Sequence, residues 1–260
     1  STILALSPKD RQGRSLAFYI IGSSLALVIG IPLTRALSAV LDWRSIFWIL
    51  NAMMLLSLAY FLKYLPKADH EATKLDLKNE LKFFKDGKTL LLFAYTFAMF
   101  MGYNAFYTYA TPYLLLLFPS IEPLMSLILV ALGLASFTGN LIGGHVSDAI
   151  GYAKSLMLGA ALQTAAMLLI LVFQPAKWLS VLFTIVWLMS AWFTGLQLNT
   201  GIAQVTENKS SFMLSINSSL IQLGGAFGAS LAAIVINLSG IQSIAVVALL
   251  TSLALVLIQL

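Results

Sequence analysis

The sequence predicts an all-α integral membrane protein, and three observations support this fold class. Apolar residues make up 60% of the 260-residue chain and charged residues only 10%, whereas a soluble domain carries about 25% charged residues. Eight apolar stretches are long enough to cross a bilayer, which takes about 20 helical residues. None of these stretches alternates apolar and polar residues like a half-buried strand, and lipid excludes open sheet edges. We therefore expect about eight transmembrane helices.

The expected helices follow one another with short connections that hold charges and helix breakers. Residues 1–6 are interpreted as the end of an earlier helix. The eight expected spans are residues 16–37, 45–62, 90–117, 123–143, 155–173, 178–201, 212–236 and 243–260.

One connection is long and rich in lysine. Residues 63–88 contain seven lysines and five acidic residues. Apolar residues at Leu75, Leu77, Leu81, Phe83 and Phe84 fit a short amphipathic helix on the membrane surface. A solvated linker with some helix fits the same pattern, and the sequence does not decide between them.

The composition also excludes several classes of site. The chain has no cysteine, and its two histidines, His70 and His145, are far apart in sequence, so we expect no metal centre and no cofactor. The net charge is +5, and seven of the fifteen basic residues lie in the lysine-rich connection, where acids are interleaved. This pattern favours a membrane-surface loop over a nucleic-acid groove. No acids, histidines or nucleophiles converge at one depth, as a membrane enzyme would require.

The distribution of basic residues predicts the orientation in the membrane. If residue 1 lies in the cytoplasm, twelve basic residues fall on the cytoplasmic side, and only Arg35, Arg44 and Lys177 fall outside. The positive-inside rule therefore places the lysine-rich connection and the C-terminus in the cytoplasm.

The first and seventh spans share a weak internal repeat. Ser23, Ser24, Leu25 and Gly30 align at a constant offset of 195 with Ser218, Ser219, Leu220 and Gly225. Both spans would start on the cytoplasmic side, six helices apart, as in two six-helix halves repeated in parallel. We therefore expect that about four helices of the first half lie upstream of Ser1.

Several motifs, in order, resemble the major facilitator superfamily. Residues 11–17, Gly22, Gly30-Ile31-Pro32 and residues 42–47 resemble its fifth and sixth helices, with Arg44 in the Trp-Arg-x-x-Phe start of the sixth. The pattern Gly144-x-x-x-Asp148-x-x-Gly151-x-x-Lys154 resembles the second copy of its cytoplasmic loop motif. Residues 196–199 and 217–228 resemble the bacterial drug–proton antiporter branch, which includes sugar, purine and multidrug efflux permeases.

The resemblance implies a partial fold. Residues 1–62 would hold the end of the fourth helix with the fifth and sixth helices. Residues 63–89 would form the cytoplasmic linker, and residues 90–260 the C-terminal six-helix bundle. The sequence departs from the family at Ile31, which separates Gly30 from Pro32, and at Ala149 and Ile150, which replace the base expected after Asp148.

The resemblance also implies a function. The chain would belong to a secondary active transporter in the cell inner membrane, monomeric when full length, that exports a sugar, nucleobase or drug-like solute by alternating access coupled to protons. The alternative is a truncated fragment that inserts in the bilayer without transporting. No Asp, Glu, Lys or Arg lies deep in any expected span, so a proton carrier would lie upstream, or His145 or Asp148 would serve from the edge.

Polar residues within the spans are the candidate solute contacts, because unpaired polar groups in hydrocarbon are costly. Amides and phenols suit an uncharged or amphipathic solute. Interhelical hydrogen bonds, or an interfacial aromatic belt for the tyrosines, are the alternative. The candidates are Tyr103, Asn104, Tyr107, Gln197, Asn199, Asn217 and Gln222.

A second group concerns gating and helix packing. Asp148 either holds the inward side closed with Lys154 or caps the following helix. Gly139, Gly143, Gly224 and Gly228 present bare backbone to another helix. By resemblance, Gly139 and Gly143 would contact Gly30 and Pro32, and the face of Gly224 and Gly228 would lack its partner. The gating and motif candidates are Gly30, Pro32, Arg44, Gly144, Asp148, Gly151 and Lys154.

Overall fold

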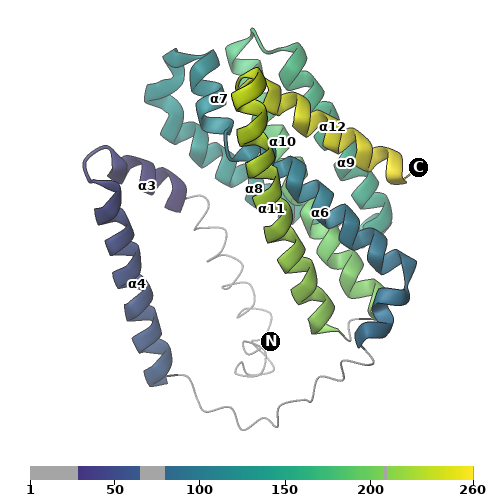
Figure 1. Cartoon of the computed structure of the whole chain (residues 1–260). Coiled ribbons are helices and arrows are strands. Elements are labelled where there is room, and N and C mark those ends of the chain that lie inside the picture. Colours follow the sequence, from purple (N-terminus) through teal and green to yellow (C-terminus); the bar gives the residue numbers. More distant parts are fainter. Residues whose placement is uncertain (1–28, 65–79, 208–209, 260) are drawn as a thin grey trace. The chain divides into compact units, whose positions relative to one another are not determined.

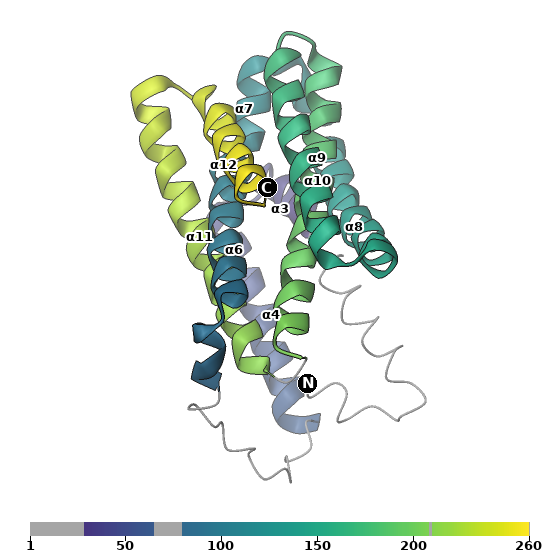
Figure 2. The same cartoon turned by 90° about the vertical axis from the view of Figure 1, so that its right-hand side faces the viewer.

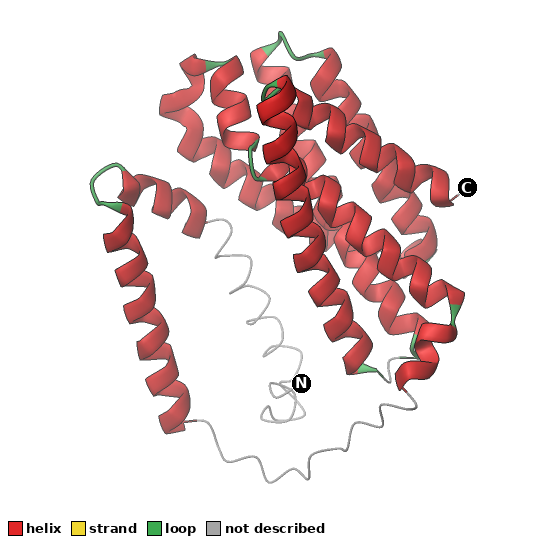
Figure 3. Cartoon of the chain, in the orientation of Figure 1, coloured by secondary structure: helices red, strands yellow, loops and turns green. Residues whose placement is uncertain are grey.

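The computed structural model describes residues 29–64, 80–207 and 210–259, and the regular elements of this part are all helices (Figure 3). The chain divides into two compact units, Ser1–Asp76 and Leu77–Leu260. Among the described residues, six helical spans are long and apolar enough to cross a membrane, and the last helix is a shorter apolar one. The prediction of an all-α, multi-pass membrane protein is confirmed.

The first unit contains a helical hairpin. Helix α3 (Ile31–Ser38) starts with Pro32 in its first turn, where a missing N–H costs nothing. Helix α4 (Trp43–Tyr64) follows and packs against α3, and Ile46 is its one buried residue. Most of the expected span 16–37, and the expected helix end at 1–6, lie outside the described residues.

The second unit contains the remaining spans (Figure 1). The expected span 90–117 is one membrane span, Gly87–Leu117, but its helix is interrupted between α6 and α7. Pro112 is the third residue of α7, and its ring would clash with the carbonyl of Thr108 in an unbroken helix. The helices are α6 (Gly87–Tyr107), α7 (Ala110–Leu117), α8 (Met125–Ile150), α9 (Tyr152–Val172), α10 (Lys177–Val205), α11 (Ser211–Ser239) and α12 (Ser243–Gln259).

The helix α8 continues seven residues beyond the expected end of its span. The 3₁₀ helix η3 (Pro119–Leu124) precedes α8, which ends only at Ile150. Gly143 and Gly144 therefore lie inside a helix, a position that membrane helices tolerate more often than soluble ones. The real break comes at Gly151, whose φ of 83° is accessible mainly to glycine.

Two triplets of helices share one packing pattern. Helix α6 packs mainly on α11 and α12, whereas α10 packs mainly on α8 and α9. Helices α9 and α12 also contact each other, as Figure 2 shows. Exchanging α6 with α10, α11 with α8 and α12 with α9 reproduces these pairs, as expected for a repeat inside a transporter half. The faces of α6 and α10 therefore occupy equivalent places.

The end of the lysine-rich connection is anchored to this unit. The 3₁₀ helix η2 (Leu81–Lys85) leads into α6, and the Phe84 ring lies 5.9 Å from that of Phe93. The Ser210 hydroxyl donates to Glu80 and accepts a hydrogen bond from the N–H of Met213, so it caps α11. The predicted amphipathic helix lies largely outside the described residues.

Candidate functional site

A chain of neutral polar side chains joins three helices. Thr96 of α6 donates to the Oδ1 atom of Asn217 of α11 over 2.8 Å. The Nδ2 group of Asn217 donates in turn to the Oδ1 atom of Asn199 of α10 over 3.0 Å. Asn217 and Thr96 are fully buried, and Asn199 is half-buried. Because each polar group finds a partner on another span, the chain fixes α6, α10 and α11 to one another.

Gln197 makes a separate connection from α10 to α8. Its Nε2 group donates to the carbonyl oxygens of Gly143 over 2.9 Å and of Phe193 over 3.3 Å. The side chain is fully buried, and its Oε1 atom has no hydrogen-bond partner among the described residues. Gln197 therefore lies against a neighbouring helix rather than on an accessible face.

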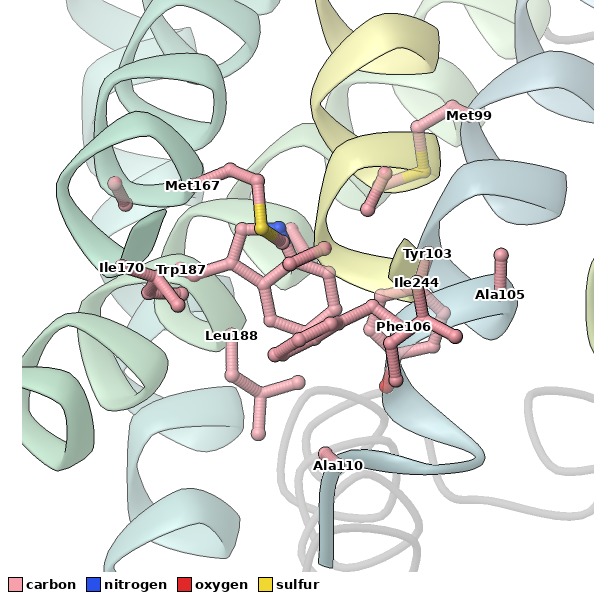
Figure 4. Packing of buried hydrophobic residues seen from close by; sticks show 14 of the residues in the cluster. Met99, Tyr103, Ala105, Phe106, Ala110, Met167, Ile170, Trp187, Leu188 and Ile244 are labelled. Carbon is pink, nitrogen blue, oxygen red and sulfur yellow. The ribbon is translucent and has the colours of Figure 1, made fainter. Parts of the chain in front are cut away.

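Aromatic rings of α6 and α10 stack in the buried core, where Figure 4 shows Tyr103, Phe106 and Trp187. The ring of Tyr103 lies between those of Tyr107, with centroids 5.1 Å apart, and Trp187, 5.5 Å apart, and both pairs are stacked. Phe106 meets Trp187 edge-on at 4.9 Å. Tyr103 and Trp187 are buried, whereas Tyr107 is half-buried. The stack therefore presents only its Tyr107 end to the surroundings.

The other two predicted contacts lie on α6 and α11. Asn104 is half-buried, donates to the carbonyl of Phe100 over 3.0 Å and lies against Gly225 of α11. Gln222 is exposed on α11. The predicted set therefore separates into buried connections at Tyr103, Gln197 and Asn217, and accessible groups at Asn104, Tyr107, Asn199 and Gln222.

Sequence reasoning missed Thr96 and Trp187. Thr96 looks like an ordinary residue of an apolar span. Trp187 carried a usable signal, because it lies in the middle of its span, whereas membrane tryptophans usually gather at the interfaces. A mid-span tryptophan therefore indicates a packed interior position.

Glycines set the two closest helix pairs. A Cβ atom at Gly139 would overlap the carbonyl of Met189 on α10, and one at Gly228 would overlap that of Met101 on α6. Gly224 lies in the same way against the carbonyl of Phe97, whereas a Cβ atom at Gly143 would come within 3.3 Å of the carbonyl of Phe193. The expectation that Gly224 and Gly228 lack a partner is wrong, because α6 covers them. The face of Gly139 and Gly143, which we expected to contact Gly30 and Pro32, is occupied by α10.

The loop motif surrounds the junction of α8 and α9. Asp148 and Lys154 are exposed, Gly144 is half-buried, and Gly151 forms the turn. Gly151 is the residue before α9, and no side chain caps this helix, so capping by Asp148 is not observed. The Nδ1 atom of His145 lies 2.8 Å from the carbonyl oxygen of Leu141.

The motif residues of the first unit are exposed or half-buried. Arg44 is exposed, with its guanidinium 4.6 Å from the ring centre of Trp43 and 4.0 Å from Asp42. Gly30 and Pro32 lie at the start of α3 and are half-buried. In the described part of the chain, no three His, Asp or Glu residues gather as metal ligands would.

Known proteins resemble this chain over nearly its whole length. The profile of the Major Facilitator Superfamily matches residues 1–120. The chain is 28% identical over 239 residues to the uncharacterized MFS-type transporter YbcL of Bacillus subtilis, covering 92% of this chain and 61% of that protein. It is 26% identical over 231 residues to a probable sugar efflux transporter of Pasteurella multocida, covering 89% of this chain and 57% of that protein.

A third relative gives the same result. A probable sugar efflux transporter of Helicobacter pylori is 25% identical over 249 residues, covering 93% of this chain and 61% of that protein. The chain thus spans about three fifths of the length of the curated relatives that it matches. The helical spans, the ordered motifs and these matches together support a transporter similar to those of the major facilitator superfamily.

Proposed function

We propose that this chain forms part of a secondary active transporter that exports a small, uncharged or amphipathic organic solute. The relatives named probable sugar efflux transporters favour a sugar, and a nucleobase or drug-like solute fits the same chemistry. Residues 1–62 end the first half, 63–89 form a cytoplasmic linker, and 90–260 form the second half. The protein is monomeric when full length, lies in the inner membrane and has a cytoplasmic C-terminus.

The observation that supports this proposal is that α6 and α10 both carry neutral hydrogen-bonding groups and stacked aromatic rings. The accessible end of the polar chain at Asn199 and the accessible end of the stack at Tyr107 come from α10 and α6, which occupy equivalent places in the two triplets. Amides offer donors and acceptors to hydroxyl groups, and ring faces pack against apolar faces of a solute. Neither group carries a formal charge.

Within this site, we assign solute contact to Asn104, Tyr107, Asn199 and Gln222, the accessible members of the predicted set. Tyr103, Gln197 and Asn217 act as positioning residues, because they are buried and contact the groups or helices behind the site. The solute would therefore be held by a few side chains on rigid spans.

Alternating access would move one half of the protein against the other. We propose that Asp148 and Lys154, with Gly144 and Gly151 shaping the loop, close the cytoplasmic side, and that Gly30, Pro32 and Arg44 belong to the matching region of the first half. In α4, α6, α8, α9, α10 and α11, the Asp, Glu, Lys and Arg residues lie within three residues of a helix end. If protons drive export, His145 or Asp148 is the candidate carrier in the described residues.

The proposal is tested by solute counterflow in proteoliposomes. The purified chain is compared with Tyr107→Ala, Asn199→Ala and, as a control, Leu168→Ala, which is exposed on α9. Labelled sugars, purines and cationic dyes are supplied in turn. We expect saturable exchange of one solute class, a loss of about tenfold in each site variant from one missing hydrogen bond or ring contact, and no change in the control.

The alternative is that the chain inserts in the bilayer but does not transport. This alternative must be tested, because the chain covers only about three fifths of the length of its relatives. A longer in-frame product of the same gene is therefore assayed in parallel. Exchange by the longer product but not by the 260-residue chain would support the alternative. Absence of exchange in both proteins, for every solute, would refute the export proposal.

A further inference from the structure

A cavity of about 230 Å³ lies between α6 and α9, close to the end at which both helices begin. Two turns of α6 line one side, from Lys88 to Tyr95, and the first two turns of α9 line the other, from Tyr152 to Met157. Gly201 of α10 allows this arrangement, because a Cβ atom there would come within 2.9 Å of the Tyr152 ring. The cavity is separate from the proposed solute site, and none of its lining residues belongs to that site.

The cavity continues a groove that α12 fills farther along. Two turns beyond Tyr95, Gly102 lies against Thr251 of α12, and Leu255 reaches the level of Met99. Helix α12 contacts both α6 and α9 in this region (Figure 2). No described residue of α12 lines the cavity itself. The groove therefore stays unfilled along its first two turns.

The mouth of the cavity favours an anion. Helices α6 and α9 both begin there, and a helix N-terminus carries a partial positive charge. Lys88 is exposed at the same end, and none of the described residues that line the cavity is acidic. The nearest acid in sequence, Asp86, accepts hydrogen bonds from the N–H and the hydroxyl of Thr89, so it serves as the cap of α6.

The lining below the mouth has the opposite character. Leu91, Leu92, Ala153, Leu156 and Met157 are apolar, and the tyrosine rings complete the wall. A cationic mouth above an apolar slot matches a phospholipid, with its phosphate near Lys88 and an acyl chain inside. In a membrane, basic pockets between helices on the cytoplasmic side bind anionic headgroups.

We propose that this cavity is a binding site for one anionic phospholipid of the cytoplasmic leaflet. The proposal rests on the predicted orientation and not on transport, so it stands whether or not the chain exports a solute. The lipid completes the packing that α12 leaves open, and it would fix the first turns of α6 and α9 at the membrane surface.

The test uses the absence of cysteine in the chain. Ala153→Cys is labelled with a small fluorophore and reconstituted in phosphatidylcholine vesicles that contain a low fraction of a bromine-labelled quenching lipid. The quencher is either phosphatidylglycerol or phosphatidylcholine at equal mole fraction. Leu168→Cys, exposed farther along the same helix, is the matched control position.

We expect phosphatidylglycerol to be favoured about fivefold at position 153, the preference that a single lysine near a membrane surface typically gives. No preference is expected at position 168. Lys88→Gln should remove the preference at position 153 and Lys88→Arg should keep it. Met157→Trp, which fills the slot, should reduce quenching by both lipids.

Three results would overturn the proposal. Equal quenching by the two lipids at position 153 would show bulk lipid without selection. A preference that survives Lys88→Gln would place the anion elsewhere. Cross-linking of two copies of the unlabelled Ala153→Cys variant through the introduced thiol, with no quenching of the labelled protein, would show that a second copy fills the groove.

Discussion

Helices α4 and α10 are almost equally apolar, and each is long enough to cross a membrane. Their surroundings nevertheless differ, because α4 buries only Ile46, whereas α10 buries fourteen residues. The buried face of α10 contains Gly195, Gly201 and Gln197 among its contacts, and α4 has no glycine at all. Hydropathy therefore decides that a helix enters the membrane, while small and polar residues decide which helix it packs against.

The largest test of this difference compares one tryptophan from each helix. Trp187→Ala removes a ring that stacks on Tyr103 and meets Phe106. Because lipid is as apolar as the core, burial of the ring gains little from the hydrophobic effect, and its removal mainly costs packing contacts. We therefore expect a decrease of about 3 kcal/mol in the free energy of unfolding. The measurement is a denaturant titration in detergent micelles.

The matched control is Trp48→Ala on α4, where the side chain is 71% exposed. We expect it to change the free energy of unfolding by less than about 0.5 kcal/mol. If both variants lost the same stability, the exposed face of α4 would contribute as much packing as the buried face of α10. The contrast between the two helices would then be contradicted.

A second test concerns glycine contacts. Gly228→Ala places a Cβ atom on the backbone carbonyl of Met101, which must move, so we expect a loss of about 2 kcal/mol. At Gly144 the nearest atom to an added Cβ lies 3.9 Å away, so Gly144→Ala should be neutral or should stabilise the helix by up to about 1 kcal/mol. The midpoint of thermal unfolding in micelles measures the stability of both variants. A decrease in both would contradict the conclusion that only Gly228 lies in a tight helix contact.

A third test concerns the polar chain. Asn217→Leu removes the hydrogen bonds to Thr96 and Asn199 and leaves both partners buried or half-buried, so we expect a loss of about 1.5 kcal/mol. Thr96→Val removes one bond while keeping the shape of the side chain, so about 0.6 kcal/mol is expected. Because both variants act on one chain, their effects should not add in the double variant. Simple addition would mean that the two bonds are independent.

Much of this fold could be predicted from the sequence, and the reason is physical. Bilayer thickness fixes the length of a span, so the spans containing Trp187 and Asn217 were placed within a few residues. The ends were less certain, because Pro112 breaks a helix whereas Gly144 does not. The predictions of which helix packs on Gly139 and Gly228 were wrong. A glycine face indicates that another helix comes close, but it does not identify that helix.

The candidate site was only partly predictable. Polar residues within spans identified Asn199, Asn217 and Gln197, since hydrocarbon demands that each finds a partner. The sequence could not separate Asn199, which stays accessible, from Gln197, which bonds to α8. This distinction depends on the rotation of a helix about its axis, which only packing against its neighbours determines.

The smallest effect is expected at the start of α6, where Asp86 accepts hydrogen bonds from the hydroxyl and the N–H of Thr89. The helix α10, by contrast, begins without a capping side chain. The hydroxyl and N–H bonds from Thr89 hold the pKa of Asp86 below its usual value of 3.8; desolvation opposes them, and the N–H and the charge of Lys88 add smaller lowering effects. Its stabilising contribution is therefore complete above that value and is lost as the pH falls through the lowered pKa.

Two variants at this position separate the cap from its charge. Asp86→Asn keeps an acceptor for the Thr89 N–H, so it should retain most of the stability at neutral pH and lose the acid dependence below about pH 4. Asp86→Ala should lose both the stability from the cap at neutral pH and its acid dependence. The midpoint of thermal unfolding is followed between neutral and acid pH. An Asp86→Ala variant with the wild-type acid dependence would assign that dependence to another group, and packing alone would then account for the stability of α6.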